Sequence, residues 1–220
     1  MKKIFALRKQ LYVLLAGVTL MVSAYEPVYA ACGAITRTYD AGGAQPYWST
    51  NANWSNNNRP NSANENAILN AGGTGYLWVY NGNQQCGCFE AVSGFIAWWT
   101  SNLTIHGDYF RALQPGTHYI GQNSSRLTMA GTAAQTLETV GLIPNLTITN
   151  NTSVTFTDAF SVRTALVMSG TTTDLNIDAD FNVTTNSAWT VPAGNTVHIR
   201  NGATITLAGN LTINGTWLMD

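Results

Sequence analysis

Apolar and polar residues alternate in short runs from about residue 145 onward. The apolar residues come in pairs separated by one polar residue, and Asn, Asp, Gly, Pro or Ser stand between the pairs. Period-two alternation is typical of a strand with one buried face, and the intervening residues are typical turn formers. The pattern predicts very short strands at Leu146/Ile148, Val154/Phe156, Phe160/Val162, Leu166/Met168, Leu175/Ile177, Phe181/Val183, Trp189/Val191, Val197/Ile199, Ile205/Leu207 and Leu211/Ile213.

The spacing of these pairs indicates how the strands are arranged. Every third pair recurs after a nearly constant interval, which favours three short strands per period over a hairpin-linked sandwich. The predicted fold class is therefore all-β: a right-handed parallel β-helix, three-sided, with about 21 residues per coil. The intervals are 20 residues from Leu146 to Leu166, 21 from Val154 to Leu175, 22 from Leu175 to Val197, 22 from Val183 to Ile205, 22 from Trp189 to Leu211 and 20 from Val197 to Trp217.

Residues 31–107 lack this regularity and hold most of the tryptophans. Because an open solenoid end exposes apolar rungs and strand edges, we expect an irregular aromatic N-terminal cap with irregular first coils here, and regular coils over 108–220. Aromatic clusters can also bind sugar rings. We predict Trp48 and Trp54 as cap aromatics, and Trp98 and Trp99 as candidate glycan contacts.

Residues 1–30 have the composition of a secretory signal peptide. A cationic start is followed by an apolar run from Leu11 to Tyr25 and by a small-residue exit at Ala30, too short a run for a lasting transmembrane helix. We predict cleavage after Ala30, a secreted or outer-surface location, and no transmembrane segment in the mature chain. Cys32 lies close enough to the cut to raise lipoprotein anchoring as the less favoured alternative.

The charged residues that remain after this cut are few. Six arginines and no lysine stand against ten acidic residues, which gives residues 31–220 a net charge of −4. No basic surface for phosphates is indicated, so nucleic acid is not an expected partner.

Three cysteines remain in the exported chain. In an oxidising compartment we expect one disulfide, from Cys32 to either Cys86 or Cys88. Cys86 and Cys88 are two residues apart in an extended segment, where a bridge between them would be at its upper geometric limit. Zinc bound by this pair with His106 and His118 is a weaker alternative, since the spacing is not that of usual zinc sites.

The segment TTTDLNIDADFNV places several carboxylates on one face of a predicted strand. Asp174, Asp178 and Asp180 form a row that could hold calcium, the one candidate cofactor. The same row could mimic the acid/base pair of a polysaccharide hydrolase. However, the adjacent Asp pair and Gly-His-Gly step of pectinase-like hydrolases are missing, and His198 has no neighbouring carboxylate in sequence. We therefore predict no catalytic residues and no enzyme activity.

Threonines recur in TxT steps on the predicted outer faces. Stacked threonine ladders can order water and bind ice or crystalline polysaccharide, although threonine is also an ordinary strand former. The steps are Thr147/Thr149, Thr155/Thr157 and Thr204/Thr206.

Two longer stretches resemble a known family. WSTNANWSNNNRPNSANENAIL, from Trp48, and GTAAQTLETVGLIPNLTITNNTSVTFTDAF, from Gly131, are similar to segments of bacterial exported β-helical surface and adhesin-like proteins, the Bacteroidetes-type and autotransporter-passenger-like solenoids. The resemblance implies an extracellular solenoid, often part of a longer adhesin. The chain departs from that picture because it is short and stops at GTWLMD in mid-coil.

Together these features predict a secreted or cell-surface structural or adhesive β-solenoid module. Its expected partners are copies of itself, through an open C-terminal coil, or other surface-protein subunits. The alternative is a carbohydrate-active protein that binds, or less plausibly cleaves, an extracellular glycan along one solenoid face.

Overall fold

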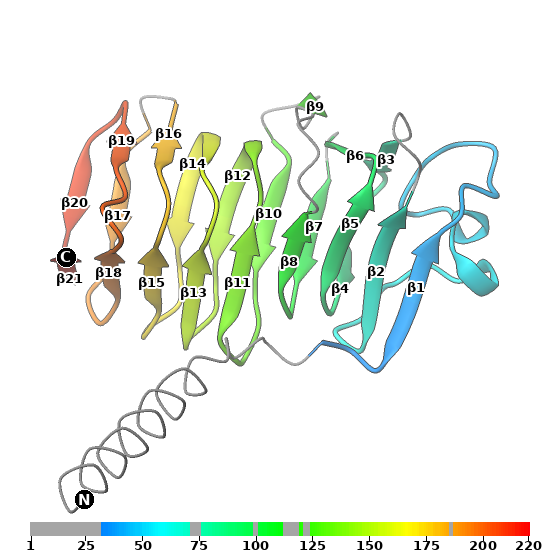
Figure 1. Ribbon diagram of the computed structural model, residues 1–220, viewed down its shortest axis with the longest axis horizontal. Helices are drawn as coiled ribbons and strands as arrows, with labels where there is room; N and C mark the ends of the chain where they lie inside the picture. Colours follow the sequence, from blue (N-terminus) through cyan, green and yellow to red (C-terminus); the bar gives the residue numbers. More distant parts are fainter. Residues whose placement is uncertain (1–31, 71–75, 99–100, 112–118, 121–123, 185–186) are drawn as a thin grey trace, which may run out of the picture.

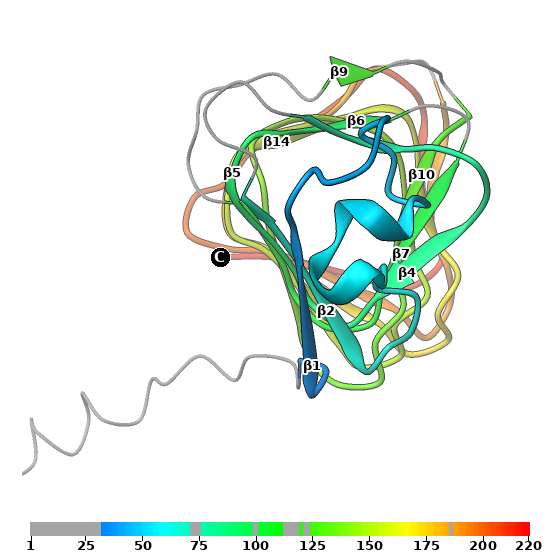
Figure 2. The same ribbon diagram turned by 90° about the vertical axis from the view of Figure 1, so that its right-hand side faces the viewer.

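The structure is a computed structural model that describes residues 32–70, 76–98, 101–111, 119–120, 124–184 and 187–220 (Figure 1). Short parallel strands stack side by side along one long axis, and the chain advances from β1 at one end to β21 at the other. The fold is an all-β solenoid, as the sequence predicts. Viewed along the axis, the coils superimpose as a rounded triangle (Figure 2).

The first side of the solenoid is a parallel sheet that runs the whole length of the described chain. Each of its strands pairs with the strand one coil later. In order, the strands are β1 (Ile35–Tyr39), β2 (Glu65–Asn70), β5 (Phe89–Ser93), β8 (Tyr109–Arg111), β11 (Gln135–Glu138), β13 (Ser153–Phe156), β15 (Asp174–Ile177), β18 (Thr196–Ile199) and β21 (Thr216–Met219).

The other two sides share strands where the corner between them flattens. β12 and β14 are long and continuous, and a register shift between Ile143 and Asn145 marks the corner within β12. The second side begins with β3 (Tyr76–Val79), β6 (Phe95–Trp98) and β9 (Tyr119–Ile120), and the third with β4 (Gln84–Cys86), β7 (Asn102–Ile105) and β10 (Arg126–Met129). Later coils add β12 (Gly141–Ile148), β14 (Phe160–Met168), β16 (Phe181–Val183), β17 (Trp189–Val191), β19 (Ile205–Leu207) and β20 (Leu211–Ile213).

The core consists of apolar side chains stacked in register from coil to coil. Leu175 pairs with Val154 on one side and with Val197 on the other, and all three are fully buried. Five of the six predicted intervals are register pairs of this kind. Since burial of apolar surface stabilises by about 25 cal/mol per Å², these rows supply the main driving force for stacking.

The sixth predicted interval, from Val183 to Ile205, is wrong. Ile205 pairs with Phe181, and Val183 pairs with Leu207, so the interval on this side is 24 residues. The corner between β18 and β19 has five residues, whereas the corresponding corner between β15 and β16 has three. The longer corner turns through Asn201 and Gly202, both with positive φ, a conformation that glycine and asparagine adopt readily.

Buried amide side chains close the corner that leads into the first side. Asn150 is fully buried, and its Nδ2 donates to Gln135 Oε1 at 2.9 Å and to Ala133 O at 2.7 Å. Two coils later Asn195 Nδ2 donates to Gly170 O at 2.9 Å, while its Oδ1 accepts from Thr173 N at 2.7 Å. Buried backbone groups at these turns therefore find partners within the protein.

The N-terminal end of the solenoid is closed by the cap that the sequence predicts. Two short 3-10 turns, η1 (Asn51–Asn53) and η2 (Ser55–Asn57), lie across the end of the triangle (Figure 2). Trp48 and Trp54 are fully buried beneath them, with ring centroids 4.9 Å apart. The indole N–H of Trp48 donates to Pro60 O at 3.1 Å, and that of Trp54 donates to Trp48 O at 2.9 Å. Both buried N–H groups therefore have hydrogen-bond partners.

The C-terminal end differs from this capped end. We call β19, β20 and β21 the C-terminal coil. Trp217 and Met219 stand in register with the buried Val197 and Ile199, yet Met219 is 71% exposed. Leu211 and Ile213, in register with buried Trp189 and Val191, are also exposed. Among the described residues, no helix is long and apolar enough to cross a membrane.

Candidate binding site

A group of aromatic side chains gathers on the outer surface beside the cap. In β3, Leu77 and Val79 are fully buried, so the alternating residues Tyr76, Trp78 and Tyr80 lie on the outer face. Tyr76 is 46% exposed, while Trp78 and Tyr80 are half-buried. One strand and the residue after it therefore present three aromatic rings in a row.

A fourth aromatic residue comes from the cap. Tyr47 forms a parallel bridge with Trp78, held by hydrogen bonds from Trp78 N to Pro46 O and from Trp48 N to Trp78 O, both 2.8 Å. The short segment around Tyr47 thus acts as an additional strand beside β3. The rings of Tyr47 and Tyr80 have centroids 4.9 Å apart, within the range of favourable aromatic pairs.

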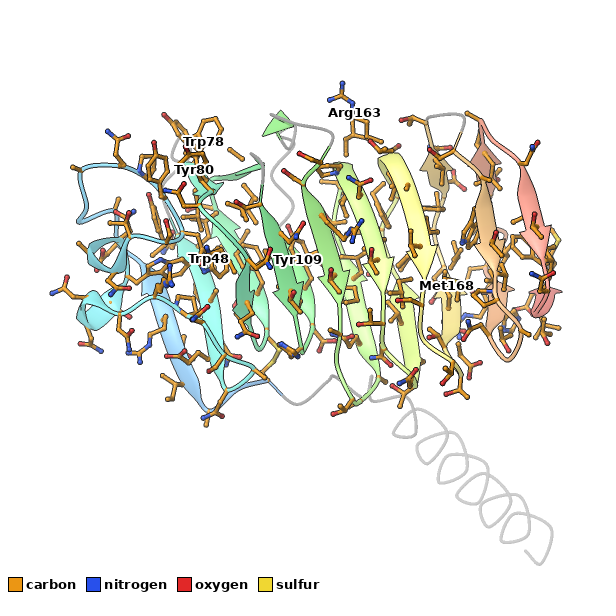
Figure 3. All side chains as sticks on the ribbon, turned by 180° about the vertical axis from the view of Figure 1, so that it is seen from behind. Trp48, Trp78, Tyr80, Tyr109, Arg163 and Met168 are labelled. Atoms are coloured by element: carbon orange, nitrogen blue, oxygen red, sulfur yellow. A yellow bond between two sulfur atoms is a disulfide. The ribbon has the colours of Figure 1, made fainter. Side chains whose placement is uncertain are left out.

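These rings border a pocket of about 340 Å³, which we call the aromatic pocket. Tyr76 and Trp78 meet edge to face, at 5.6 Å and an interplanar angle of 84°. Figure 3 shows Trp78 and Tyr80 close together near the surface at the end that holds Trp48. The described residues that line it are Gln45, Pro46, Tyr47, Tyr76, Trp78 and Tyr80, and none of these is a carboxylate, a lysine, an arginine or a histidine.

The cap fixes the position of the pocket wall. Asn53 is fully buried, and its Nδ2 donates to the carbonyls of Gln45 (2.6 Å) and Tyr47 (2.9 Å). Its Oδ1 accepts from Gly43 N at 2.8 Å. On the other side, the hydroxyl of buried Tyr39 donates to Tyr76 O at 3.4 Å. The pocket is consequently supported by packed and hydrogen-bonded groups.

This pocket was not predicted from the sequence, in which Trp78 lies within residues 31–107, the region expected to form an irregular cap and irregular first coils. The available signal was the alternation in YLWVY, which puts three aromatic residues on one strand face. Of the predicted glycan contacts, Trp98 pairs with Val79 through its backbone in β6. Its side chain, and the whole of Trp99, fall outside what the structure describes.

The structure joins Cys32 to Cys88, with Cα atoms 5.1 Å apart. This resolves the two alternatives that the sequence left open. Cys86 ends β4 with its thiol fully buried, and burial raises the pKa of that thiol.

The predicted zinc site is not formed by the described residues. Asp108 lies beside the disulfide, but both sulfur atoms are bonded to each other and supply no thiolate for a metal. Of the predicted zinc partners, His118 is outside the described residues, and His106 Nε2 lies 3.2 Å from Gln85 Oε1.

The structure does not bring the predicted calcium ligands together. Carboxylate oxygens of Asp174, Asp178 and Asp180 do not gather within 4.8 Å of one another. Asp178 instead forms a two-pronged ion pair with Arg200, with N–O distances of 2.7 and 2.9 Å. Asp180 Oδ1 accepts from Thr204 N at 2.9 Å in the next coil. These contacts therefore join neighbouring coils, and the guanidinium of Arg200 pairs with the Asp178 carboxylate that was predicted to bind calcium.

The stacking of coils also decides the surroundings of His198 and of the threonines in the TxT steps. His198 Nε2 lies 2.7 Å from Asp220 Oδ1, a carboxylate one coil further along the chain. The threonine column Thr104, Thr128 and Thr147 is interrupted by Val167, and the column that contains Thr155 continues with Asn176. The outer face is therefore not a regular threonine ladder.

One carboxyl pair was not identified from the sequence. Glu138 and Asp158 lie on successive coils where the chain leaves the first side. Burial raises the pKa of Asp158, and burial followed by the charge of Asp158 raises that of Glu138. Asp158 Oδ2 is buried without a hydrogen-bond partner among the described residues.

Comparisons with protein-family models, with curated proteins and with solved structures find no match to this chain.

Proposed function

We propose that the chain is an exported, surface-associated adhesive module, in which the solenoid is a rigid support and the aromatic pocket is the contact site. The observation that carries this proposal is the gathering of Tyr47, Tyr76, Trp78 and Tyr80 around one pocket on the outer surface. Large aromatic side chains dominate recognition surfaces because they bury much area at little entropic cost. Core rows in register make the solenoid a stiff support for such a site.

Two features support export. Residues 1–30 have the charge and hydropathy pattern of a secretory signal, and Cys32 and Cys88 are paired, which suits an oxidising compartment. Surface labelling of cells that produce the full chain, with a membrane-impermeant biotin reagent, tests this part. Labelling of the chain in intact cells supports export, whereas labelling only after lysis contradicts it.

Adhesion is tested with purified full chain carrying a fluorophore. We expect it to bind whole cells or shed extracellular matrix of the producing organism, and we expect Trp78→Ala to weaken this binding at least tenfold. Val167→Ala is the matched control, since Val167 is also on an outer face, at 41% exposure, but far from the pocket. Equal binding by the Trp78→Ala variant and the unaltered chain would remove the pocket from the proposal.

We propose a binding role rather than a catalytic one. Asp178 is held by Arg200, and Asp180 accepts a backbone hydrogen bond, so neither carboxylate is free to act as a general acid or base without breaking a contact. Loss of polysaccharide-cleaving activity in an Asp178→Asn variant would contradict this.

A second proposal concerns self-association. The C-terminal coil exposes Leu211, Ile213 and Met219, which stand in register with buried residues. Apolar groups and strand edges of this kind favour pairing with another chain. We propose that, in a chain that ends at Asp220, the coil binds the C-terminal coil of a second copy, because the cap covers the other end of the solenoid.

A further inference from the structure

We infer that the ligand of the aromatic pocket is an uncharged oligosaccharide that lies along β3. This inference rests on the proposed function, because it names the ligand class of the same site. Its starting point is the row formed by Tyr76, Trp78 and Tyr80. Successive outward residues of a strand are about 6.6 Å apart, so the row is about 13 Å long. A row of this length favours an extended ligand over a compact one.

The chemistry of the lining indicates a ligand with apolar faces and polar edges. The face of an aromatic ring carries partial negative charge, which attracts the polarised C–H groups on the face of a sugar ring. Tyrosine hydroxyls and the Gln45 amide can each donate and accept hydrogen bonds, as sugar hydroxyls also can. A purely apolar ligand would offer no hydrogen bonds to the Gln45 amide or to the Tyr47 and Tyr76 hydroxyls.

The charge of the described lining favours an uncharged ligand. An acidic sugar would require a basic partner and a cation would favour a carboxylate, and the six lining residues that the structure describes include neither. Aromatic cages for quaternary ammonium groups are the nearest alternative. Here the rings meet in pairs, Tyr47 with Tyr80 and Tyr76 with Trp78, and the described lining adds no carboxylate that would strengthen the binding of a cation.

The size of the pocket agrees with a short stretch of glycan. Its volume of about 340 Å³ is near the lower limit of the range of about 300–1,000 Å³ for small-molecule sites. With Tyr76 46% exposed, the site is accessible from the side and needs no chain end to enter. We therefore expect binding to internal segments of a polysaccharide.

Affinity electrophoresis of the full chain tests the inference. The gels contain a neutral polysaccharide (hydroxyethyl cellulose, laminarin, mannan or dextran) or an acidic one (alginate). We expect at least one neutral polymer to retard the chain, and Trp78→Ala and Tyr76→Ala each to weaken that binding at least tenfold. Val167→Ala should bind like the unaltered chain, and near-ultraviolet circular dichroism checks that every variant is folded. The use of two pocket variants keeps the test valid if one of them fails to fold.

Salt and competition separate the ligand classes. Binding of a neutral glycan should change less than twofold between 50 and 500 mM NaCl, whereas an ionic ligand would be screened. Retardation by alginate alone, or competition by choline chloride, would overturn the inference. Absence of binding to every neutral polymer would also overturn it.

The failure of this inference can be told from the failure of the proposed function. If adhesion to cells still depends on Trp78 while neutral glycans do not bind, the proposed function stands and the ligand class is wrong. If glycans bind but adhesion is independent of Trp78, the adhesive function is wrong.

Discussion

Asn53 helps to fix the cap segment that carries Tyr47 beside the aromatic pocket. Its buried amide donates to the carbonyls of Gln45 and Tyr47, which also accept from Tyr47 N and Thr50 N, and it accepts from Gly43 N. Loss of this amide would remove one hydrogen bond from each carbonyl and the Asn53 acceptor of Gly43 N. We expect Asn53→Ala to lower the free energy of unfolding by roughly 2–3 kcal/mol and to weaken binding at the pocket. Urea denaturation measures the first effect. Asn58→Ala, at an exposed position directly after η2, is the control, and an equal loss in both variants would contradict the role of Asn53.

Glu138 and Asp158 each contribute to the pH dependence of stability with a definite sign. The pKa of each carboxyl is raised in the folded state, chiefly by burial. Their contribution to stability is complete below the ordinary values of 4.5 and 3.8, and it is lost as the pH rises through the raised values. Asp158→Asn replaces one of these carboxyls with an amide that does not ionise, so the variant does not lose the stability that ionisation of Asp158 costs. Its Tm relative to the unaltered chain should therefore be higher at pH 7 than at pH 4.

Differential scanning calorimetry at both pH values measures that change. Asp174→Asn makes the same change of charge at an exposed site and is the matched control. A Tm difference for Asp158→Asn that stays constant between pH 4 and pH 7 would show that burial of this carboxyl costs no stability.

At the scale of strands, the Cys32–Cys88 bridge fastens the segment before β1 to the corner before β5. The bridged residues are separated by 56 positions, a loop for which chain entropy predicts a stabilisation of roughly 4 kcal/mol. We expect the double variant Cys32→Ala/Cys88→Ala to lose up to this amount, measured by guanidinium unfolding. Cys86→Ala is the comparison within the core. A double variant as stable as the unaltered chain would contradict the prediction.

The strands themselves could be predicted because their signal is local and periodic. Each inward pair, such as Leu175 and Ile177, meets its equivalent one period later, so spacing alone indicates the stacking. The pairing of Phe181 with Ile205 could not be predicted as reliably. Corners vary by two residues because only the strands must stay in register, and the chain can lengthen a turn at little cost.

The site was harder to predict than the fold because its contacts join different coils. The pairs Asp178–Arg200 and His198–Asp220 are each 22 residues apart, so the coil period could have indicated them. Tyr47 and Trp78 are 31 residues apart and lie in the irregular cap, where no period applies. The alternation of residues therefore indicates which side chains of β3 point outward, but it does not indicate that the segment around Tyr47 lies beside β3.

At the scale of the whole molecule, the two ends of the solenoid have different surfaces. The cap buries Trp48 and Trp54 at one end, while the C-terminal coil exposes inward-facing apolar side chains at the other. Head-to-tail stacking would require an apolar surface at both ends, and it would produce open filaments. A surface at one end only allows the same surface of two copies to meet around a two-fold axis. For a chain that ends at Asp220, we therefore expect closed dimers instead of fibres.

Sedimentation velocity of the full chain at increasing concentration tests this expectation. Met219→Asp places a charge among the exposed inward residues and should shift the dimer to monomer, because burial of an unpaired carboxylate opposes association. Leu218→Asp is the matched control: it adds the same charge one residue away, on the opposite face of β21 beside His198, and should leave the dimer intact. Filaments would mean that the cap also binds a copy. A monomer at every concentration, or equal loss in both variants, would mean that the exposed coil is not a self-association surface.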